Sequence, residues 1–123
     1  MQLHSKISDA EWMVMRVLWS EGRPLTSHDI IQALSTRESW APNTVRTLLS
    51  RLVAKKAIGF QKNGKSYLYH SRIEEKDCVR EASQSFLERV FGGALEPMLA
   101  HFVREKKLTP AQIAKLKRLL DDE

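Results

Sequence analysis

Residues 42–56 read PNTVRTLLSRLVAKK, and residues 58–69 follow with IGFQKNGKSYLY. The first stretch has helical periodicity, because its apolar residues recur at steps of three, one, three and one and form a single stripe. Pro42 suits the first turn of a helix, where its missing N–H costs no hydrogen bond. A helix is therefore predicted from about Pro42 to Lys56. Its buried stripe is expected to be Val45, Leu48, Leu49, Leu52 and Val53.

The other faces of this predicted helix carry no carboxylate. A solvated helix face ordinarily mixes Glu with Lys for pairing at i,i+4, whereas here short hydrogen-bonding groups stand beside long cations. Such a face suits the binding of a polyanion. The alternative is a solvated basic surface that has no binding partner. Its residues are Asn43, Thr44, Arg46, Thr47, Ser50, Arg51 and Lys55.

Past this helix the periodicity changes to alternation on both sides of Asn63-Gly64. An Asn-Gly pair between β-prone residues is a strong hairpin signal, because a type I′ turn needs positive φ at both central residues. Two short strands are predicted, joined by a cationic tip that contains Lys62 and Lys65. Two aromatic residues of the second strand are expected to pack the hairpin onto the helices: Tyr67 and Tyr69.

Two further helices are predicted upstream. Residues 8–11, SDAE, have the spacing of a capping box, in which each end residue accepts a hydrogen bond from the other's backbone amide. Residues 26–29 repeat the signature before a short second helix, and residues 35–40 are polar and expected to form a loop. Three helices and a basic hairpin make a winged helix-turn-helix, whose third helix can enter the major groove of DNA. The expected fold class is mainly α with a small β-hairpin.

The positive charge lies in the N-terminal part of the chain. The 123 residues include 20 Lys and Arg and 15 Asp and Glu, a formal net charge of +5. Residues 1–72 hold 11 of these cations against 5 acids, whereas residues 73–123 hold 9 against 10. From Ser39 to Ile73 there are seven cations and no acid. A segment of this kind suits a phosphate backbone.

Residues 73–123 are predicted to form three amphipathic helices, with a Gly-Gly break at 92–93 and a helix-capping signature at 109–112. Three short helices cannot bury so many large side chains among themselves, so a second copy is the expected partner; the alternative is a monomeric helical cap. The predicted domains are residues 1–72, for DNA binding, and 73–123, for homodimerisation. The expected interface residues are Phe86, Val90, Leu95, Met98, Leu99, Phe102, Leu116 and Leu119.

Several classes of protein are disfavoured. With one cysteine, Cys78, the chain holds no internal disulfide and no zinc site made of cysteines alone. It has no glycine-rich phosphate loop, and its four histidines lack metal-ligand spacing, so neither an enzyme nor a cofactor is expected. No apolar stretch approaches the roughly 20 residues that span a bilayer, and the start lacks a secretory h-region. We expect a cytoplasmic protein without membrane insertion.

Three separated blocks of the chain carry a family resemblance. They are ISDAEWMVMRVLW at residues 7–19, PNTVRTLLSRLVAKKAI with KNGKSYLY at 42–58 and 62–69, and FLERVFGGALEPMLAHFV with LTPAQIAKLKRLL at 86–103 and 108–120. Together they resemble the penicillinase and methicillin-resistance repressors, the BlaI/MecI/CopY family that also includes copper-responsive repressors. The resemblance implies a homodimeric repressor that binds a pseudo-palindromic operator in double-stranded DNA. It also implies that Thr44, Arg46 and Thr47 lie on the recognition helix, with Arg51 and the hairpin near phosphates.

The resemblance offers two routes of induction. In the β-lactam branch a membrane-bound sensor protease leads to cleavage of an Asn-Phe bond in the dimerisation domain, and the matching pair here is His101-Phe102. The Asn is absent, so this chain departs from the pattern of that branch. In the copper branch, paired Cys-X-Cys motifs bind metal, and this chain has a single cysteine.

The chemistry of the side chains points to the same DNA-binding candidates. A guanidinium can donate two hydrogen bonds to guanine O6 and N7, so Arg46 is the best candidate for reading a base, with a phosphate contact as the alternative. Thr44 and Thr47 can bind phosphate or place a methyl group against thymine. The cations among the rest are expected to contact phosphates without reading sequence. These remaining candidates are Asn43, Arg51, Lys55, Lys62 and Lys65.

Two other functions stay open. A winged helix can bind protein or RNA instead of DNA, but acids would then be expected among the cations. The chain could also be a ligand-responsive or metal-responsive regulator that is not controlled by proteolysis, with His4, Cys78 and His101 converging between subunits.

Overall fold

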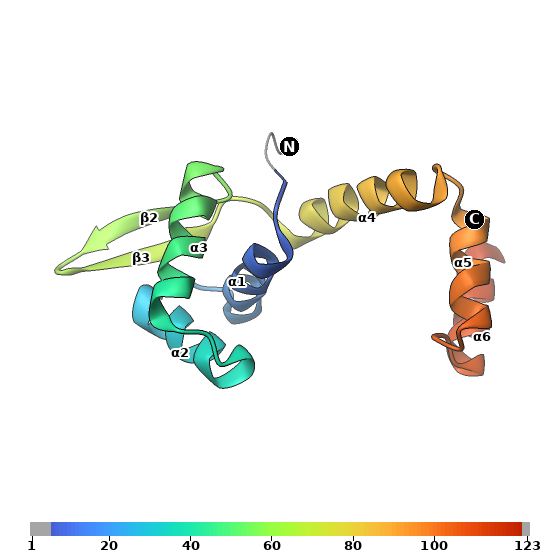
Figure 1. Cartoon of the computed structure of the whole chain (residues 1–123), viewed down its shortest axis with the longest axis horizontal. Coiled ribbons are helices and arrows are strands. Elements are labelled where there is room, and N and C mark those ends of the chain that lie inside the picture. The colour runs from blue at the N-terminus through green and yellow to red at the C-terminus, as the bar shows by residue number, and fades with distance from the viewer. Residues whose placement is uncertain (1–5, 122–123) are drawn as a thin grey trace. The chain divides into compact units, whose positions relative to one another are not determined.

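The computed structural model describes residues 6–121 (Figure 1). The chain divides into two compact units between Val79 and Arg80. The predicted class, mainly α with a small β-hairpin, is confirmed. The elements are α1 (Asp9–Glu21), β1 (Leu25–Thr26), α2 (Ser27–Glu38), α3 (Pro42–Ala54), β2 (Ile58–Asn63), β3 (Ser66–Ser71), α4 (Glu75–Phe91), α5 (Leu95–Arg104) and α6 (Pro110–Asp121).

Both predicted capping boxes at the start of the chain are confirmed. The Ser8 hydroxyl accepts from the Glu11 amide at 3.1 Å, and the Glu11 carboxylate accepts from the Ser8 amide at 2.8 Å. Thr26 and Asp29 make the same reciprocal pair at the start of α2. The prediction of a loop over residues 35–40 is wrong for residues 35–38, because these residues extend α2 by a further turn. Polar residues do not stop a helix when they lie on its solvent side, and α2 ends only where Ser39 adopts a left-handed φ of 58°.

The helix α3 begins at Pro42 and buries the predicted stripe against the rest of the N-terminal unit. Four of the five stripe residues are buried, and Val53 is half-buried. The half-buried Trp40 packs against the same core just before the helix. The other buried members of the core are Val14, Met15, Val17, Leu18, Leu25, Ile30, Leu34, Ala57, Ile58, Ile73 and Cys78.

A three-stranded antiparallel sheet of order β1-β3-β2 completes the N-terminal unit. The hairpin β2–β3, called the wing below, was predicted, whereas β1 was not. The predicted type I′ turn at Asn63-Gly64 is wrong, because Asn63 stays in the ladder opposite Ser66 and the two-residue loop is Gly64-Lys65. Only Gly64 of the two loop residues has positive φ, 66°, which is the pattern of a type II′ turn.

The C-terminal unit consists of most of α4 together with α5 and α6. The break after α4 has positive φ at Gly92 and Gly93, and Thr109 and Gln112 form the predicted cap of α6. No described residue from Arg80 onward is buried. Ile73 and Cys78, by contrast, belong to the core of the N-terminal unit, so the first turn of α4 packs there. Within residues 6–121, no helix is both long and apolar enough to cross a membrane.

Candidate nucleic-acid interface

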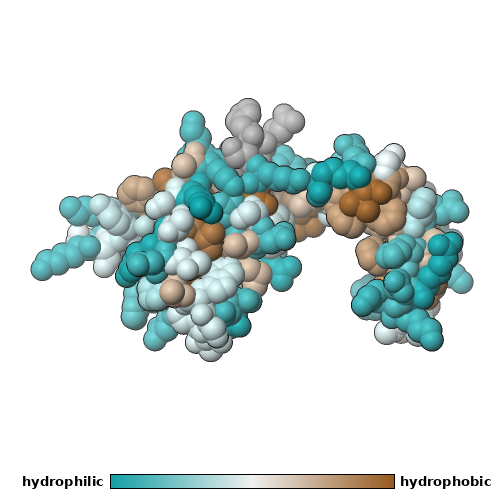
Figure 2. Space-filling model, viewed as in Figure 1, coloured by the Kyte–Doolittle hydropathy of each residue, from teal (hydrophilic) through white to brown (hydrophobic). Residues whose placement is uncertain are grey.

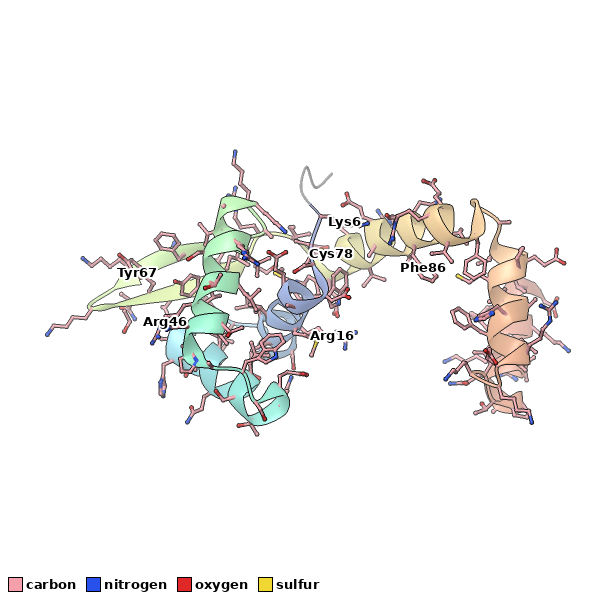
Figure 3. All side chains as sticks on the ribbon, viewed as in Figure 1. Lys6, Arg16, Arg46, Tyr67, Cys78 and Phe86 are labelled. Carbon is pink, nitrogen blue, oxygen red and sulfur yellow. The ribbon has the colours of Figure 1, made fainter. Side chains whose placement is uncertain are left out.

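The polar side chains of α3 between Asn43 and Arg51 are exposed to solvent. The buried stripe turns toward α1 and α2, which leaves the opposite side of the helix in solvent. Figure 3 shows Arg46 on α3 and Tyr67 on the wing, both on the side of the N-terminal unit away from Cys78. The exposed predicted residues of α3 are Asn43, Thr44, Arg46, Thr47 and Arg51.

Two hydrogen bonds organise the start of this face. The Arg46 guanidinium donates from Nη1 to Asn43 Oδ1 at 3.2 Å, and the Thr47 hydroxyl donates to the Asn43 carbonyl at 2.9 Å. A guanidinium has five N–H donors, so Arg46 keeps donors for a base or a phosphate while Asn43 holds its orientation. Thr47 has used its hydrogen, so it offers a methyl group and an acceptor oxygen to a ligand.

The wing adds two further cations. Lys62 lies on β2 and Lys65 in the turn, and both are exposed. The hairpin extends well past α3 (Figure 1), so its tip lies farther out than α3. We name the combined set the cationic surface: Asn43, Thr44, Arg46, Thr47, Arg51, Lys62 and Lys65.

Lys55 stands apart from the cationic surface, although the sequence placed it among the phosphate contacts. Its Nζ donates to Glu11 Oε1 at 2.5 Å and to the Lys6 carbonyl at 2.6 Å. The side chain of Lys55 is 24% exposed and that of Glu11 is 1% exposed. This ion pair ties the end of α3 to the start of α1, so Lys55 fixes α3 in the unit.

Burial and hydrogen bonding shift the pKa of Glu11 in opposite directions. Removal of its carboxyl group from water raises the pKa, but hydrogen bonds from Lys55 and the Ser8 amide outweigh this effect, so the pKa is lowered overall. Glu11 therefore keeps its charge and serves both as a helix cap and as the partner of Lys55. Sequence reasoning missed the second role. The signal was that Glu11 shares a helical face with the buried Val14, Met15 and Leu18.

The two tyrosines of the wing differ from each other. Tyr69 packs against the core, as predicted, but the prediction for Tyr67 is wrong. Tyr67 is 45% exposed and touches the ring of Phe60, which is 47% exposed. The reason is the shortness of β1, which pairs only with Leu68 and Tyr69 and leaves the outer part of the hairpin two-stranded. Sequence reasoning also missed the exposure of Phe60.

The predicted dimerisation residues lie on α4, α5 and α6, and Figure 2 shows hydrophobic side chains on the C-terminal unit. Phe86, Val90, Leu95 and Leu119 are exposed, with 54% of Val90 open to solvent. The others are half-buried: Met98, Leu99, Phe102 and Leu116. A groove between α4 and α5 is lined by Arg80, Ser83, Gln84, Phe86, Leu87, Leu95, Met98 and Phe102.

The candidate cleavage bond, His101-Phe102, lies inside α5. His101 is exposed, and its ring centroid lies 5.5 Å from that of Phe102 and 6.3 Å from that of Phe91. Within residues 6–121, no three His, Cys, Asp or Glu side chains are grouped to hold a metal ion. His4, one of the candidate sensor residues, lies outside the described residues.

Comparison with known proteins decides the family. The model of the penicillinase repressor family matches residues 7–122. The chain belongs to the penicillinase repressor family. The family resemblance drawn from the sequence is confirmed. The penicillinase repressor of Bacillus licheniformis is 34% identical over 117 residues, which cover 95% of this chain and 91% of the relative. MecI, the methicillin resistance regulatory protein of Staphylococcus aureus strain N315, is 32% identical over 116 residues, 94% of each chain.

Two solved structures of BlaI resemble the N-terminal part of this chain. The DNA-binding domain of BlaI is 36% identical, with a TM-score of 0.56, and the match covers 63% of this chain and 93% of that one. The monomeric form of Bacillus licheniformis BlaI in complex with the blaP half-operator is 36% identical, with a TM-score of 0.55 and the same coverage.

Proposed function

We propose that the protein is a homodimeric, sequence-specific DNA-binding transcriptional repressor, and not an enzyme. The observation that carries the proposal is the cationic surface, which is exposed and free of acids on α3 and the wing. It belongs to the unit that resembles the BlaI domain whose complex with a half-operator has been solved. In this role α3 enters the major groove of an operator and the wing lies along the adjacent backbone.

We propose distinct roles for the residues of the cationic surface. Arg46, held by Asn43, donates to a base edge in the major groove. Thr44 and Thr47 contact phosphate or a thymine methyl group at either side of it. The remaining cations, Arg51, Lys62 and Lys65, neutralise phosphates and position the module without reading sequence.

The C-terminal segment, residues 73–123, is proposed as the homodimerisation domain, and residues 1–72 as the DNA-binding domain. Support for dimerisation comes from burial, because no described residue from Arg80 onward is buried in the single chain. A folded unit without a buried core needs a partner surface, and a second copy provides the same apolar face in return. The dimer would present the cationic surface twice, as a pseudo-palindromic operator requires.

For induction we propose proteolysis in the C-terminal segment at His101-Phe102, prompted by a membrane-bound sensor protease. Because this bond lies in α5, the helix must unwind before a protease can bind the chain in extended form. The test is mass spectrometry of the repressor recovered from cells exposed to a β-lactam. A fragment that ends at His101 supports the proposal. An intact chain that has left its operator instead favours the ligand-responsive or metal-responsive alternative.

DNA reading is tested with duplexes selected from a randomised pool by the purified protein. The ratio of Kd for a scrambled duplex to Kd for the selected duplex is then measured. Arg46→Ala is expected to lower this ratio by about tenfold or more, because a bidentate base contact discriminates by about 1–3 kcal/mol. Arg16→Ala is the matched control, since Arg16 is an exposed arginine on α1, away from the wing (Figure 3). A wild-type ratio in the Arg46→Ala variant would show that Arg46 does not read bases.

A further inference from the structure

We propose that Phe60 and Tyr67 form an uncharged contact between the wing and the operator duplex, packing against the sugar edges of its backbone. This inference rests on the proposed function and adds to it a component of affinity that does not depend on salt. The lysines of the wing supply attraction that weakens as salt rises. The aromatic pair would hold the wing on the duplex under conditions in which that attraction is screened.

The two rings form one exposed cluster on one face of the wing. Their centroids lie 4.9 Å apart with the planes at 73°, an edge-to-face contact. In the sheet register Lys62 stands directly opposite Tyr67, and Phe60 stands directly opposite Tyr69. Side chains directly opposite each other lie on the same face of a sheet, so Lys62 shares the face of the aromatic pair. Figure 2 shows a hydrophobic patch on the hairpin among hydrophilic side chains.

Packing within the chain does not account for the position of these rings. Tyr69 is already covered by the core, whereas Tyr67 lies past the end of β1 and Phe60 lies on β2, the strand with which β1 does not pair. Nearly half of each residue remains exposed to water, 47% of Phe60 and 45% of Tyr67. An aromatic pair at this position buries more apolar surface only if something else covers it.

The surroundings of the pair indicate that its occupant is a nucleic-acid duplex. Lys62 flanks it, Lys65 is at the tip, and no acid occurs between Ser39 and Ile73. A duplex backbone offers phosphates to the lysines and the C–H groups of deoxyribose to the rings, and the hydroxyl of Tyr67 can donate to a phosphate. The patch is also continuous with the cationic surface, so one ligand would cover both.

The test measures Kd for the selected duplex between about 50 and 200 mM salt, where ionic contacts change affinity most clearly. Phe60→Thr and Tyr67→Thr remove the aromatic rings but keep a residue type that favours a strand. Each is expected to weaken binding by about tenfold at every salt concentration, as loss of buried aromatic area implies. The slope of log K against log salt should stay at the wild-type value. Gln61→Ala, an exposed residue on the opposite face, is the matched control and should change neither quantity.

The variants of the wing lysines separate the ionic contribution. Lys62→Ala with Lys65→Ala should reduce the salt slope by about two, because each lost phosphate contact removes about 0.9. The inference is overturned if Phe60→Thr and Tyr67→Thr leave Kd within twofold of the wild-type value. It is equally overturned if they reduce the salt slope along with affinity, since the rings would then serve only to keep the hairpin ordered. A wild-type protein that selects no duplex would instead overturn the proposed function.

Discussion

Replacement of Lys55 by alanine should destabilise the N-terminal unit by about 2–4 kcal/mol. Removal of one member of a buried ion pair costs about 3–5 kcal/mol, because the other charge is left without a partner. Glu11 is 1% exposed, but Lys55 is 24% exposed, so water relieves part of that cost. The variant also loses the hydrogen bond from Lys55 Nζ to the Lys6 carbonyl.

Urea denaturation followed by tryptophan fluorescence measures this loss. The three tryptophans, Trp12, Trp19 and Trp40, all lie in the N-terminal unit, so the signal reports the unfolding of that unit. Lys56→Ala is the matched control, because it removes the same charge from the next residue, which is exposed. The control should change the free energy of unfolding by less than about 0.5 kcal/mol. Equal, small losses for both variants would refute the structural role of Lys55.

The stabilisation by Glu11 should also depend on pH. The folded-state pKa of Glu11 lies below its ordinary value of 4.5, so its contribution is complete above that pH and is lost as the pH falls through the folded-state pKa. In the Lys55→Ala variant burial is no longer outweighed by the lysine, so the carboxyl group accepts a proton more readily. The difference in stability between wild type and variant should therefore shrink on acidification below about pH 5. A difference that stays constant down to pH 3 would contradict this account.

Further predictions concern three other sites. Gly59→Ala should destabilise the N-terminal unit by about 1–2 kcal/mol in urea denaturation, because a Cβ would lie 2.9 Å from two ring atoms of His70. Adding His70→Ala to this variant should restore most of the lost stability. Ser39→Gly should raise the free energy of unfolding by about 0.5–1 kcal/mol, since Ser39 has a φ of 58°, and no gain would mean that the strain is absent. Val90→Asp should shift the protein from dimer to monomer in sedimentation experiments, with the fluorescence-detected unfolding unchanged; an unaltered dimer would remove Val90 from the interface.

Local signals made most of the fold predictable. The capping boxes and the first-turn proline are defined within four residues, and α3 carries an apolar stripe that needs no knowledge of its neighbours. The exposed face of α3 followed from that stripe, because burial of one side leaves the other to solvent. These features of the sequence therefore placed most of the cationic surface correctly in solvent.

The features that escaped prediction depend on contacts distant in the sequence. The strand β1 is two residues long and exists because it pairs with β3. The length of β1 in turn decides that Tyr69 is covered while Tyr67 is not. Lys55 is a cation on a helix without acids, which is why the sequence predicted a phosphate contact. Only its proximity to Glu11, 44 residues earlier, gives it another role.

The central claim, that α3 of each copy in a dimer enters the major groove of an operator, can be tested by directed DNA cleavage. Ser50→Cys places an exposed thiol on α3 at a residue without an assigned DNA contact, and the native Cys78 is buried, so an iron chelate can be attached selectively. With the selected duplex we predict two clusters of strand cleavage in the major groove. Their centres should be one helical turn of about 10–10.5 base pairs apart, or a multiple of it. A chelate on Arg16→Cys should give much weaker cleavage. No cleavage from position 50, or a single cluster, on a duplex bound with full affinity would contradict the account.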